Sequence, residues 1–250
     1  MERRRPAWPR TWYFALCLFL LCSGRTVASE EKGIIFVMEG VGGGDMLTPW
    51  CKLALPRAGV PYAIRQFKWT HGRGRILADL QDTEHLRRKA VELAEEVRRY
   101  RTNYPEAPIF FIAKSGGTGL ALAAAELLPP ATLERIILLS AAVSPYYDLT
   151  KALRATRFEI VSFYSRADHL VLGWGTRHFG TIDRQYVPSA GLVGFAIPPE
   201  LRQVPPYNRL VEIAWTPDMI LQGHFGRHFG TSAPCFLGKH VAPWLHSRPR

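Results

Sequence analysis

The sequence predicts an α/β fold, with a mostly parallel sheet and helices on both of its faces. Short apolar runs alternate along the chain with segments of helical spacing, which is the pattern of repeated strand–helix units. Nearly all of the predicted strands are apolar throughout, as in strands that are covered on both faces. The chain has 250 residues, enough for one sizeable core, and no linker composition interrupts 33–246. We therefore expect a single domain over 33–246.

The first 28 residues are typical of a secretory signal peptide. Four arginines, the last of them Arg10, precede an apolar run from Trp12 to Cys22, and small residues surround Ala28. We expect cleavage near Ala28 or Ser29 and an exported protein, either secreted or periplasmic. An uncleaved N-terminal membrane anchor is the alternative, although the apolar run is shorter than the roughly 20 residues that span a bilayer.

The charge of the chain excludes some partners. Removal of residues 1–28 takes away five arginines and one glutamate, which lowers the formal net charge from +11 to +7. The remaining basic residues are spread along the chain and form no stripe interleaved with aromatic residues. We expect a solvated basic surface and no nucleic-acid partner. Weak contact with an anionic membrane surface stays open, and the sequence does not predict an oligomeric state.

The first half of the domain contains two predicted strands and two predicted helices. The apolar run 33–40 predicts a buried strand, 46–55 a helix, and the β-rich segment 62–69 a second strand. Asp82 can cap a helix that continues to about Tyr100, because apolar residues recur there at helical spacing.

The second half continues the alternation. The predicted strands are 108–113, 135–140, 158–164 and 209–215, and the predicted helices are 117–128, 150–155 and 236–244. A stretch rich in glycine, proline and aromatic residues, 169–207, separates the last two strands. Ligands bind outside the carboxyl ends of the strands in a sheet of this kind, so we look for the site there.

A serine occupies one of these strand ends. Ser115 lies between the apolar run 109–113 and the glycines that open the helix from 117. A tight strand-to-helix turn exposes its residue beside the free N–H groups of a helix N-terminus, which is where a nucleophile is placed. A helix N-cap is the structural alternative for Ser115.

A serine nucleophile needs a base, and the base needs an acid that orients it. Asp148 and Asp168 each follow a predicted strand after Ser115, and His224 follows the last one. The chain order serine, acid, histidine is therefore present at the sheet edge that carries Ser115.

These residues resemble the motifs of the α/β-hydrolase superfamily. Ala113 to Gly117 resembles its nucleophile elbow, Tyr164 to Asp168 its acid turn, and Gly223 to Gly226 its histidine loop. The resemblance implies a minimal form of the three-layer α/β-hydrolase sandwich over about 33–246. It also implies a catalytic role for three residues: Ser115 as nucleophile, His224 as general base and Asp168 as orienting acid.

The resemblance also implies an oxyanion hole. Its donors would be the N–H of Gly116 and one N–H of the loop after the first strand, from Gly40 or Val41. That loop, 39–44, differs from the family's usual His-Gly sequence, and Ala113 replaces the first glycine of the elbow.

Other residues compete for the same roles. Asp148 and Asp218 are alternative acids, and His228 and His178 are alternative histidines. We expect no cofactor and no metal. The glycines lie on the wrong side of Lys114 for a phosphate loop, and Gly226 weakens a helical zinc pair of His224 and His228. Cys51 and Cys235 form either one disulfide or two separate thiols.

The stretch 169–207 indicates the substrate class. It follows the acid turn, so we expect it to lie over the site, and its apolar residues favour an acyl or aryl substrate: Trp174, Phe179, Tyr186, Leu192, Val193 and Phe195. The sequence therefore predicts an exported serine hydrolase that cleaves a small-molecule carboxylic ester, lipid-like or aromatic, through an acyl-enzyme. An acyltransferase with the same triad and a binding protein that has lost the activity are the alternatives.

Overall fold

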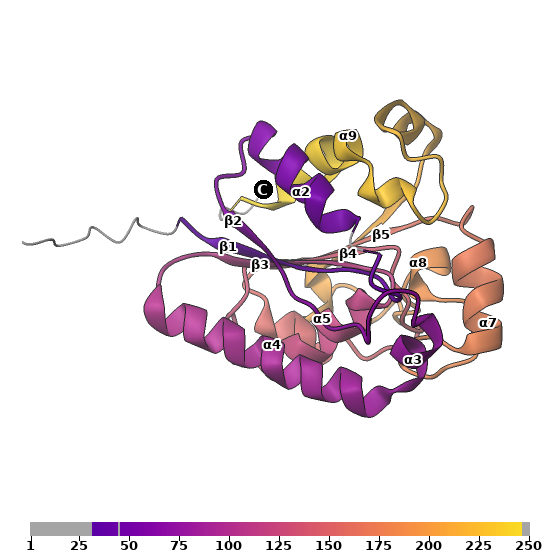
Figure 1. Ribbon diagram of the computed structural model, residues 1–250, viewed down its shortest axis with the longest axis horizontal. Helices are drawn as coiled ribbons and strands as arrows, with labels where there is room; N and C mark the ends of the chain where they lie inside the picture. Colours follow the sequence, from indigo (N-terminus) through magenta and orange to yellow (C-terminus); the bar gives the residue numbers. More distant parts are fainter. Residues whose placement is uncertain (1–31, 45, 247–250) are drawn as a thin grey trace, which may run out of the picture. The chain divides into compact units, whose positions relative to one another are not determined.

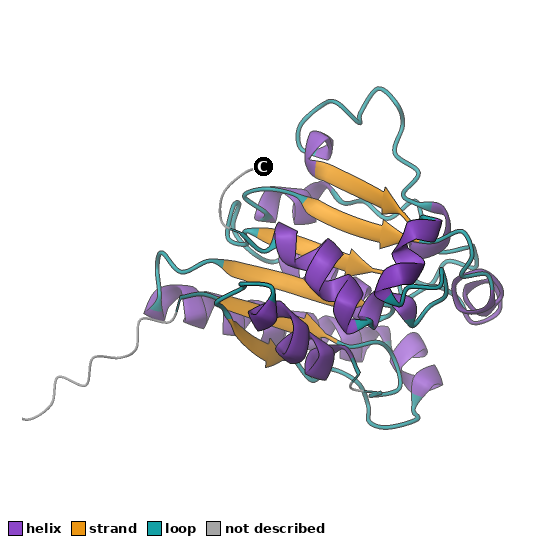
Figure 2. Cartoon of the chain, turned by 90° about the horizontal axis from the view of Figure 1, so that it is seen from above, coloured by secondary structure: helices purple, strands orange, loops and turns teal. Residues whose placement is uncertain are grey.

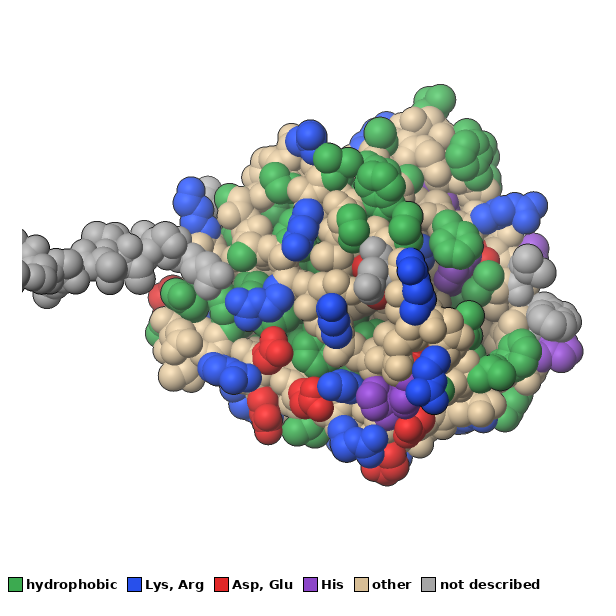
Figure 3. All heavy atoms as spheres, viewed as in Figure 1, with side chains coloured by type: hydrophobic (Ala, Val, Ile, Leu, Met, Phe, Trp, Pro, Cys, Tyr) green, Lys and Arg blue, Asp and Glu red, His purple; other side chains and the backbone are tan. Residues whose placement is uncertain are grey.

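A computed structural model describes residues 32–44 and 46–246. The predicted signal peptide and its cleavage site lie outside the described residues. Within these, no helix is both long and apolar enough to span a bilayer. Lys and Arg side chains are scattered over the face in Figure 3 and do not gather into one stripe.

Six strands form a single sheet in which every neighbouring pair is parallel. All of the strand arrows in Figure 2 point the same way. The strand order is β2-β1-β3-β4-β5-β6. The strands are β1 (Ile34–Met38), β2 (Ala63–Gln66), β3 (Ile109–Lys114), β4 (Arg135–Leu139), β5 (Ile160–Tyr164) and β6 (Leu210–Ala214). The prediction of a mostly parallel sheet is confirmed, and each predicted strand is present within a few residues of its expected bounds.

Helices cover both faces of the sheet, as predicted. On one face lie α4 (Thr83–Asn103), α5 (Gly117–Ala125) and α6 (Thr150–Ala155), and on the other lies α2 (Leu47–Arg57) with the C-terminal helices. Figure 1 shows α2 and α9 on one side of the sheet and α4 and α5 on the other. The central strands β1, β3 and β4 are buried along their whole length, because both of their faces are covered.

The helix starts follow from local sequence. Asp82 caps α4 as predicted, since its carboxylate accepts the His85 N–H at 2.8 Å. The N-cap residue of α2 provides no side-chain cap. Instead, the buried carboxylate of Glu39, in the loop after β1, accepts the N–H groups of Leu47 and Thr48 at 2.9 and 2.6 Å. Glu39 therefore joins the loop after β1 to the start of α2.

Three segments differ from the prediction. The sequence did not predict α3 (Ile76–Gln81), a single short helix before α4. The expected helix at 236–244 is instead a chain of short turns, because Gly238 and Pro243 interrupt a regular α-helix: α9 (Pro234–Phe236), η6 (Leu237–Val241) and η7 (Ala242–Trp244). The stretch 169–207 is also built of short helices: η2 (Leu170–Gly175), α7 (Thr176–Phe179) and α8 (Ala190–Val193).

Two further short helices flank β6. They are η3 (Tyr207–Arg209) before the strand and η4 (Pro217–Gln222) after it, and η5 (Gly230–Ser232) follows in the C-terminal loop. The two cysteines of the domain are separate free thiols, Cys51 buried and Cys235 exposed, which decides between the two expected states.

Candidate active site

Ser115 follows the last residue of β3 in a strained turn. Its φ is 51°, in the left-handed region that residues other than glycine rarely adopt. Its N–H donates to the Leu139 carbonyl at 3.0 Å, and its carbonyl accepts the Thr118 N–H at 3.0 Å, so the backbone is held on both sides. The residue is only 6% exposed, yet its hydroxyl makes no hydrogen bond to any described residue. Backbone strain held at a strand-to-helix turn is the conformation expected of a nucleophile elbow, although Ser115 is buried and not exposed as the sequence predicted.

Ser140 provides an internal comparison. It follows β4, the neighbouring strand, and has the same φ of 51°. Its Oγ lies 3.3 Å from the Thr231 Oγ1, so this hydroxyl has a partner in the protein. The conformation alone therefore does not single out Ser115; its unpartnered hydroxyl does.

Asp168 lies where the sequence predicted, in the turn after β5. It is buried, and its Oδ2 accepts a hydrogen bond from the Nδ1 of His228 at 2.8 Å. The same turn contacts the histidine loop a second time, because the Ser165 hydroxyl donates to the Gly226 carbonyl at 2.6 Å. The acid turn and the loop after β6 are therefore joined directly.

The expected pairing of Asp168 with His224 is replaced in the structure by a pairing with His228. The His224 Nδ1 accepts the Gly226 N–H at 3.2 Å, and its ring packs edge-on against Phe236 with centroids 4.9 Å apart. Burial lowers the pKa of His224 to about 4, against the opposing effect of the Asp168 charge. His224 is thus a neutral packing residue, and the turn at Gly226 carries His228 to the carboxylate instead.

The segment after His228 is fixed to the ends of β3 and β4. The Lys114 ammonium donates to the Ser232 hydroxyl at 2.6 Å and lies 5.0 Å from the centre of the Phe229 ring. Thr231 contacts Ser140, as described above. Because Lys114 and Ser140 are the strand-end residues beside Ser115, these contacts bring His228 to the same sheet edge as the serine.

Lys114, the residue before Ser115, is a buried cation. Its side chain is buried, and this burial lowers its pKa to about 8, although the charges of Glu39 and Asp168 act in the opposite direction. At neutral pH the ammonium is therefore still charged. The sequence motifs around Lys114 do not predict its contact with the segment after His228.

The loop after β1 lies against the elbow. A Cβ placed on Gly40 would be 3.3 Å from the Ser115 Cβ, and one placed on Gly116 would be 2.5 Å from a Val41 methyl group. The N–H groups of Val41 and Gly116 donate no hydrogen bond to any residue in the described ranges. Both N–H groups therefore keep their hydrogen-bonding capacity beside Ser115.

The alternative acids Asp148 and Asp218 and the alternative histidine His178 are found at other places in the fold. The Asp148 carboxylate accepts the Thr150 N–H at 2.9 Å and the Tyr207 hydroxyl at 3.0 Å at the start of α6, and hydrogen bonds from Thr150 are the main cause of its lowered pKa. Asp218 is exposed in the first turn of η4, and His178 is exposed on α7. The Asp148 carboxylate is therefore engaged at the start of α6, whereas Asp168 is engaged with His228.

The stretch 169–207 crosses the strand ends, as expected. Its backbone N–H groups at Ile182, Ala190 and Gly191 donate to the carbonyls of residues 141–143, directly after β4. Ile182 also packs on the elbow helix, because a Cβ on Gly119 would be 2.0 Å from an Ile182 methyl group. Part of this stretch is therefore core: Leu172, Leu192 and Phe195 are buried, whereas Tyr186 and Val193 are exposed.

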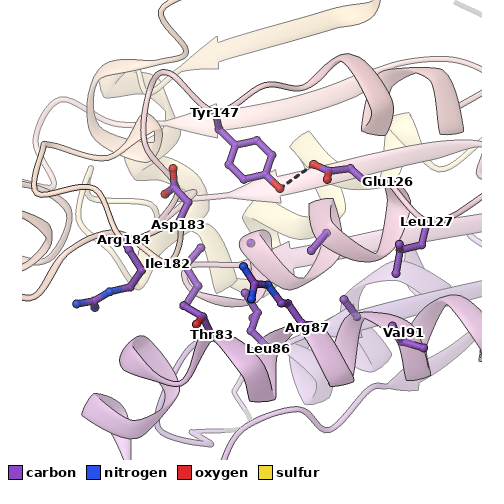
Figure 4. Close-up of a pocket in the computed structure, with 13 residues that line it drawn as sticks. Thr83, Leu86, Arg87, Val91, Glu126, Leu127, Tyr147, Ile182, Asp183 and Arg184 are labelled. Carbon is purple, nitrogen blue, oxygen red and sulfur yellow. Dashed lines mark hydrogen bonds between the residues drawn. The ribbon is translucent and has the colours of Figure 1, made fainter.

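Two cavities lie near the site, and Ser115 lines neither of them. One cavity of about 580 Å³ lies between α4 and α5. Figure 4 shows Tyr147 hydrogen-bonded to Glu126 along one side of this cavity, and Ile182 and Leu86 also line it. The other, of about 450 Å³, lies beside Glu39 and Gly43, between the loops that follow β1 and β2. The second opens at the carboxyl ends of the strands, the side on which Ser115 lies.

Comparison with known proteins supports the same fold. No protein family matches the sequence, and no curated protein matches it. Among solved structures, an α/β serine hydrolase without a lid from Xanthomonas campestris has a TM-score of 0.52 at 13% identity, over 90% of this chain and 87% of that one. An esterase from Pyrococcus furiosus has a TM-score of 0.51 at 11% identity, over 86% and 82%. The chain has the α/β-hydrolase fold, as its motifs indicated.

Proposed function

We propose that this protein is a serine hydrolase that cleaves carboxylic esters through an acyl-enzyme, with Ser115 as nucleophile, His228 as general base and Asp168 as orienting acid. The observation that carries the proposal is the hydrogen bond between Asp168 and the Nδ1 of His228 at the sheet edge that holds the strained Ser115. This bond leaves the Nε2 of His228 to accept a proton.

The reaction follows from these positions. His228 Nε2 takes the proton of the Ser115 hydroxyl while Oγ attacks the ester carbonyl. The N–H groups of Gly116 and Val41 hold the resulting oxyanion. The tetrahedral intermediate collapses, and the alkoxide leaves as an alcohol with the proton from His228. Water then attacks the acyl-enzyme by the same route and releases the acid. The serine and histidine come into hydrogen-bond contact in the substrate complex, since such contacts are often longer without substrate.

The surroundings of His228 favour an apolar substrate. Phe225 and Phe229 flank it in the chain and are 64% and 75% exposed, and Leu221 in the preceding turn is 84% exposed. Large apolar side chains exposed in the loop of a reactive histidine, with the Phe229 ring 5.6 Å from His228, favour an acyl or aryl group over a sugar or a phosphate. We propose a lipid-like or aromatic ester as substrate, and export as the N-terminal sequence predicts.

The first test is covalent labelling of the purified protein with a fluorophosphonate probe. We expect labelling that the Ser115→Ala variant abolishes. Ser140→Ala is the matched control, because Ser140 has the same φ on the neighbouring strand, and this variant should label normally. Labelling that persists in Ser115→Ala, or that is absent from the wild type, would rule out Ser115 as the nucleophile.

The second test separates the two histidines by the same substitution at each. With a short p-nitrophenyl ester, His228→Asn should lower kcat by about 10³-fold or more, because the base is lost. His224→Asn should keep kcat within about tenfold, because this residue only packs. Circular dichroism establishes that both variants fold. The opposite ranking would return the base to His224 and remove the role proposed for the Asp168–His228 pair.

A further inference from the structure

We propose that His71, Asp82 and His85, which we call the histidine cluster, bind a divalent transition metal ion of the Zn²⁺ type. The cluster joins the loop after β2 to the first turn of α4, away from the β5–β6 end of the sheet where Asp168 and His228 pair. Histidine side chains reach the surface near the junction of α3 and α4 in Figure 3, with acidic side chains beside them.

The ligand atoms of the histidine cluster are close enough to share one ion. One ring nitrogen of each histidine and one carboxylate oxygen of Asp82 lie within 4.8 Å of one another. The Nε2 of His71 is 3.2 Å from the Oδ2 of Asp82. Zinc–ligand bonds of about 2.0–2.1 Å in a tetrahedron separate neighbouring ligand atoms by about 3.3 Å, which the His71–Asp82 distance matches.

The atoms behind the ligands are arranged as they are in metal sites. Asp79, whose side chain is fully buried, accepts the Nδ1–H of His71 at 2.9 Å. This hydrogen bond orients the ring so that the Nε2 of His71 faces Asp82. The Nε2 of His85 lies 2.5 Å from the Trp69 carbonyl, so its other ring nitrogen is the lone-pair donor. Carboxylate or carbonyl partners on the second nitrogen are typical of ligating histidines.

The two rings of the histidine cluster lie close together. The His71 and His85 ring centroids are 4.0 Å apart at an interplanar angle of 31°, and a nitrogen of each ring lies near the same carboxylate oxygen of Asp82. One divalent ion can therefore be held by both rings and by Asp82.

The donor set indicates the kind of metal. Two imidazoles and one carboxylate suit Zn²⁺ or Co²⁺ better than Mg²⁺ or Ca²⁺, which prefer oxygen ligands. Three protein ligands leave a fourth position of a tetrahedron for water or another ligand. The sequence predicts no metal, and the spacing of His71, Asp82 and His85 matches no common ligand motif.

The histidine cluster is linked to the active-site loop by one residue. Besides holding His71, the Asp79 carboxylate accepts the Gly42 N–H at 2.6 Å, one residue beyond Val41. If the proposed oxyanion role of Val41 is right, bound metal would order the loop that supplies this donor. This consequence depends on the proposed function, whereas the metal site itself does not.

The binding test uses the chelator-treated full chain and ZnCl₂ in isothermal titration calorimetry. We expect saturable binding of a single ion, a rise in Tm of about 5–10 °C at a Zn²⁺ concentration about 100 times Kd, and a visible absorption band of tetrahedral Co²⁺ when CoCl₂ replaces zinc. Absence of saturable binding and of the Co²⁺ band in the wild type would overturn the proposal, whatever the esterase activity.

The variants locate the site. Asp82→Asn keeps the N-cap of α4, since asparagine caps as well as aspartate, but removes the ligand charge; we expect at least a tenfold weaker affinity. His85→Gln should lose binding to a similar degree. His246→Ala removes an exposed histidine outside the cluster and should bind as the wild type does. Unchanged affinity in both cluster variants, or equal loss in His246→Ala, would place the ion elsewhere.

Discussion

At the scale of single residues, His224 and His228 lie four positions apart in one loop and have different surroundings. His224 lies under the loop against Phe236 and Trp215, and its main-chain carbonyl accepts the Trp215 indole N–H at 2.7 Å. His228 lies against a carboxylate. The two rings therefore differ in what surrounds them, although the same Phe-Gly pair follows each histidine in the sequence.

The buried His224 makes the fold sensitive to acid. Its pKa is about 4 in the folded protein, against about 6.5 in an unfolded chain. Between these values the unfolded chain binds the extra proton, so stability is lost as pH falls from about 6.5 to about 4. We predict a falling Tm over this window in calorimetry, and a smaller fall in the His224→Phe variant.

The control for the acid prediction is a histidine that is not buried. His246 is exposed, so His246→Ala should leave the dependence of Tm on pH unchanged. An equally steep fall in His224→Phe would mean that other groups, among them the partly buried His240, cause the acid sensitivity.

At the scale of elements, the contact between α5 and the end of β1 positions the proposed nucleophile and oxyanion donors together. The start of α5 approaches the backbone of β1 so closely that a Cβ on Gly117 would be 2.4 Å from the Glu39 carbonyl oxygen. Glu39 in turn holds the N-terminus of α2 and begins the loop that carries Gly40 and Val41. Because Gly117 has no side chain, α5 can lie this close to the end of β1 and to the loop after β1.

Substitution at Gly117 should therefore affect both stability and turnover. We predict that Gly117→Ala lowers the free energy of unfolding by about 1–3 kcal/mol in urea, because backbone must move to admit the methyl group. The proposed esterase activity should fall as well, since the loop after β1 is displaced. Gly44→Ala is the control, because a Cβ there meets nothing within 4 Å. Equal stability of the two variants would show that the close approach is not a constraint.

At the scale of the whole described domain, the sheet separates two apolar layers, and the C-terminal segment supplies a large part of one. Phe236, Leu237, Val241 and Leu245 are fully buried against α2 and the sheet. The other layer is formed by α4, α5 and α6 with the opposite side of the strands. A segment without regular helices is therefore core, because its side chains fill the face that α2 leaves open.

Truncation should distinguish the two ends of the domain. A chain that begins at Ser29 keeps every described element, so we predict that it folds and unfolds cooperatively on heating. A chain that ends at Ala233 loses four fully buried apolar side chains and should not fold, since each costs about 2–5 kcal/mol against a total stability of about 5–15 kcal/mol. Soluble, cooperative unfolding of the shorter chain would contradict this view of the core.

The predictable part of the fold is the part with strong local signals. The strands β1, β3 and β4 are unbroken apolar runs, and α4 has both a cap and a long amphipathic pattern. The unpredicted α3 is only six residues long, too short for its pattern to stand out, and its one buried residue is the polar Asp79. The helix predicted at 236–244 was wrong, because Gly238 and Pro243 interrupt its apolar pattern.

The sequence by itself determined the α/β class, the strand-to-helix turn at Ser115 and the acid after β5, because each depends on residues close together in the chain. Only the tertiary structure decided that Asp168 pairs with His228 and that Cys51 and Cys235 stay apart. It alone showed that His71, Asp82 and His85 meet. These pairings depend on how loops turn at positions such as Gly226, and the direction of a turn is set by packing between distant segments.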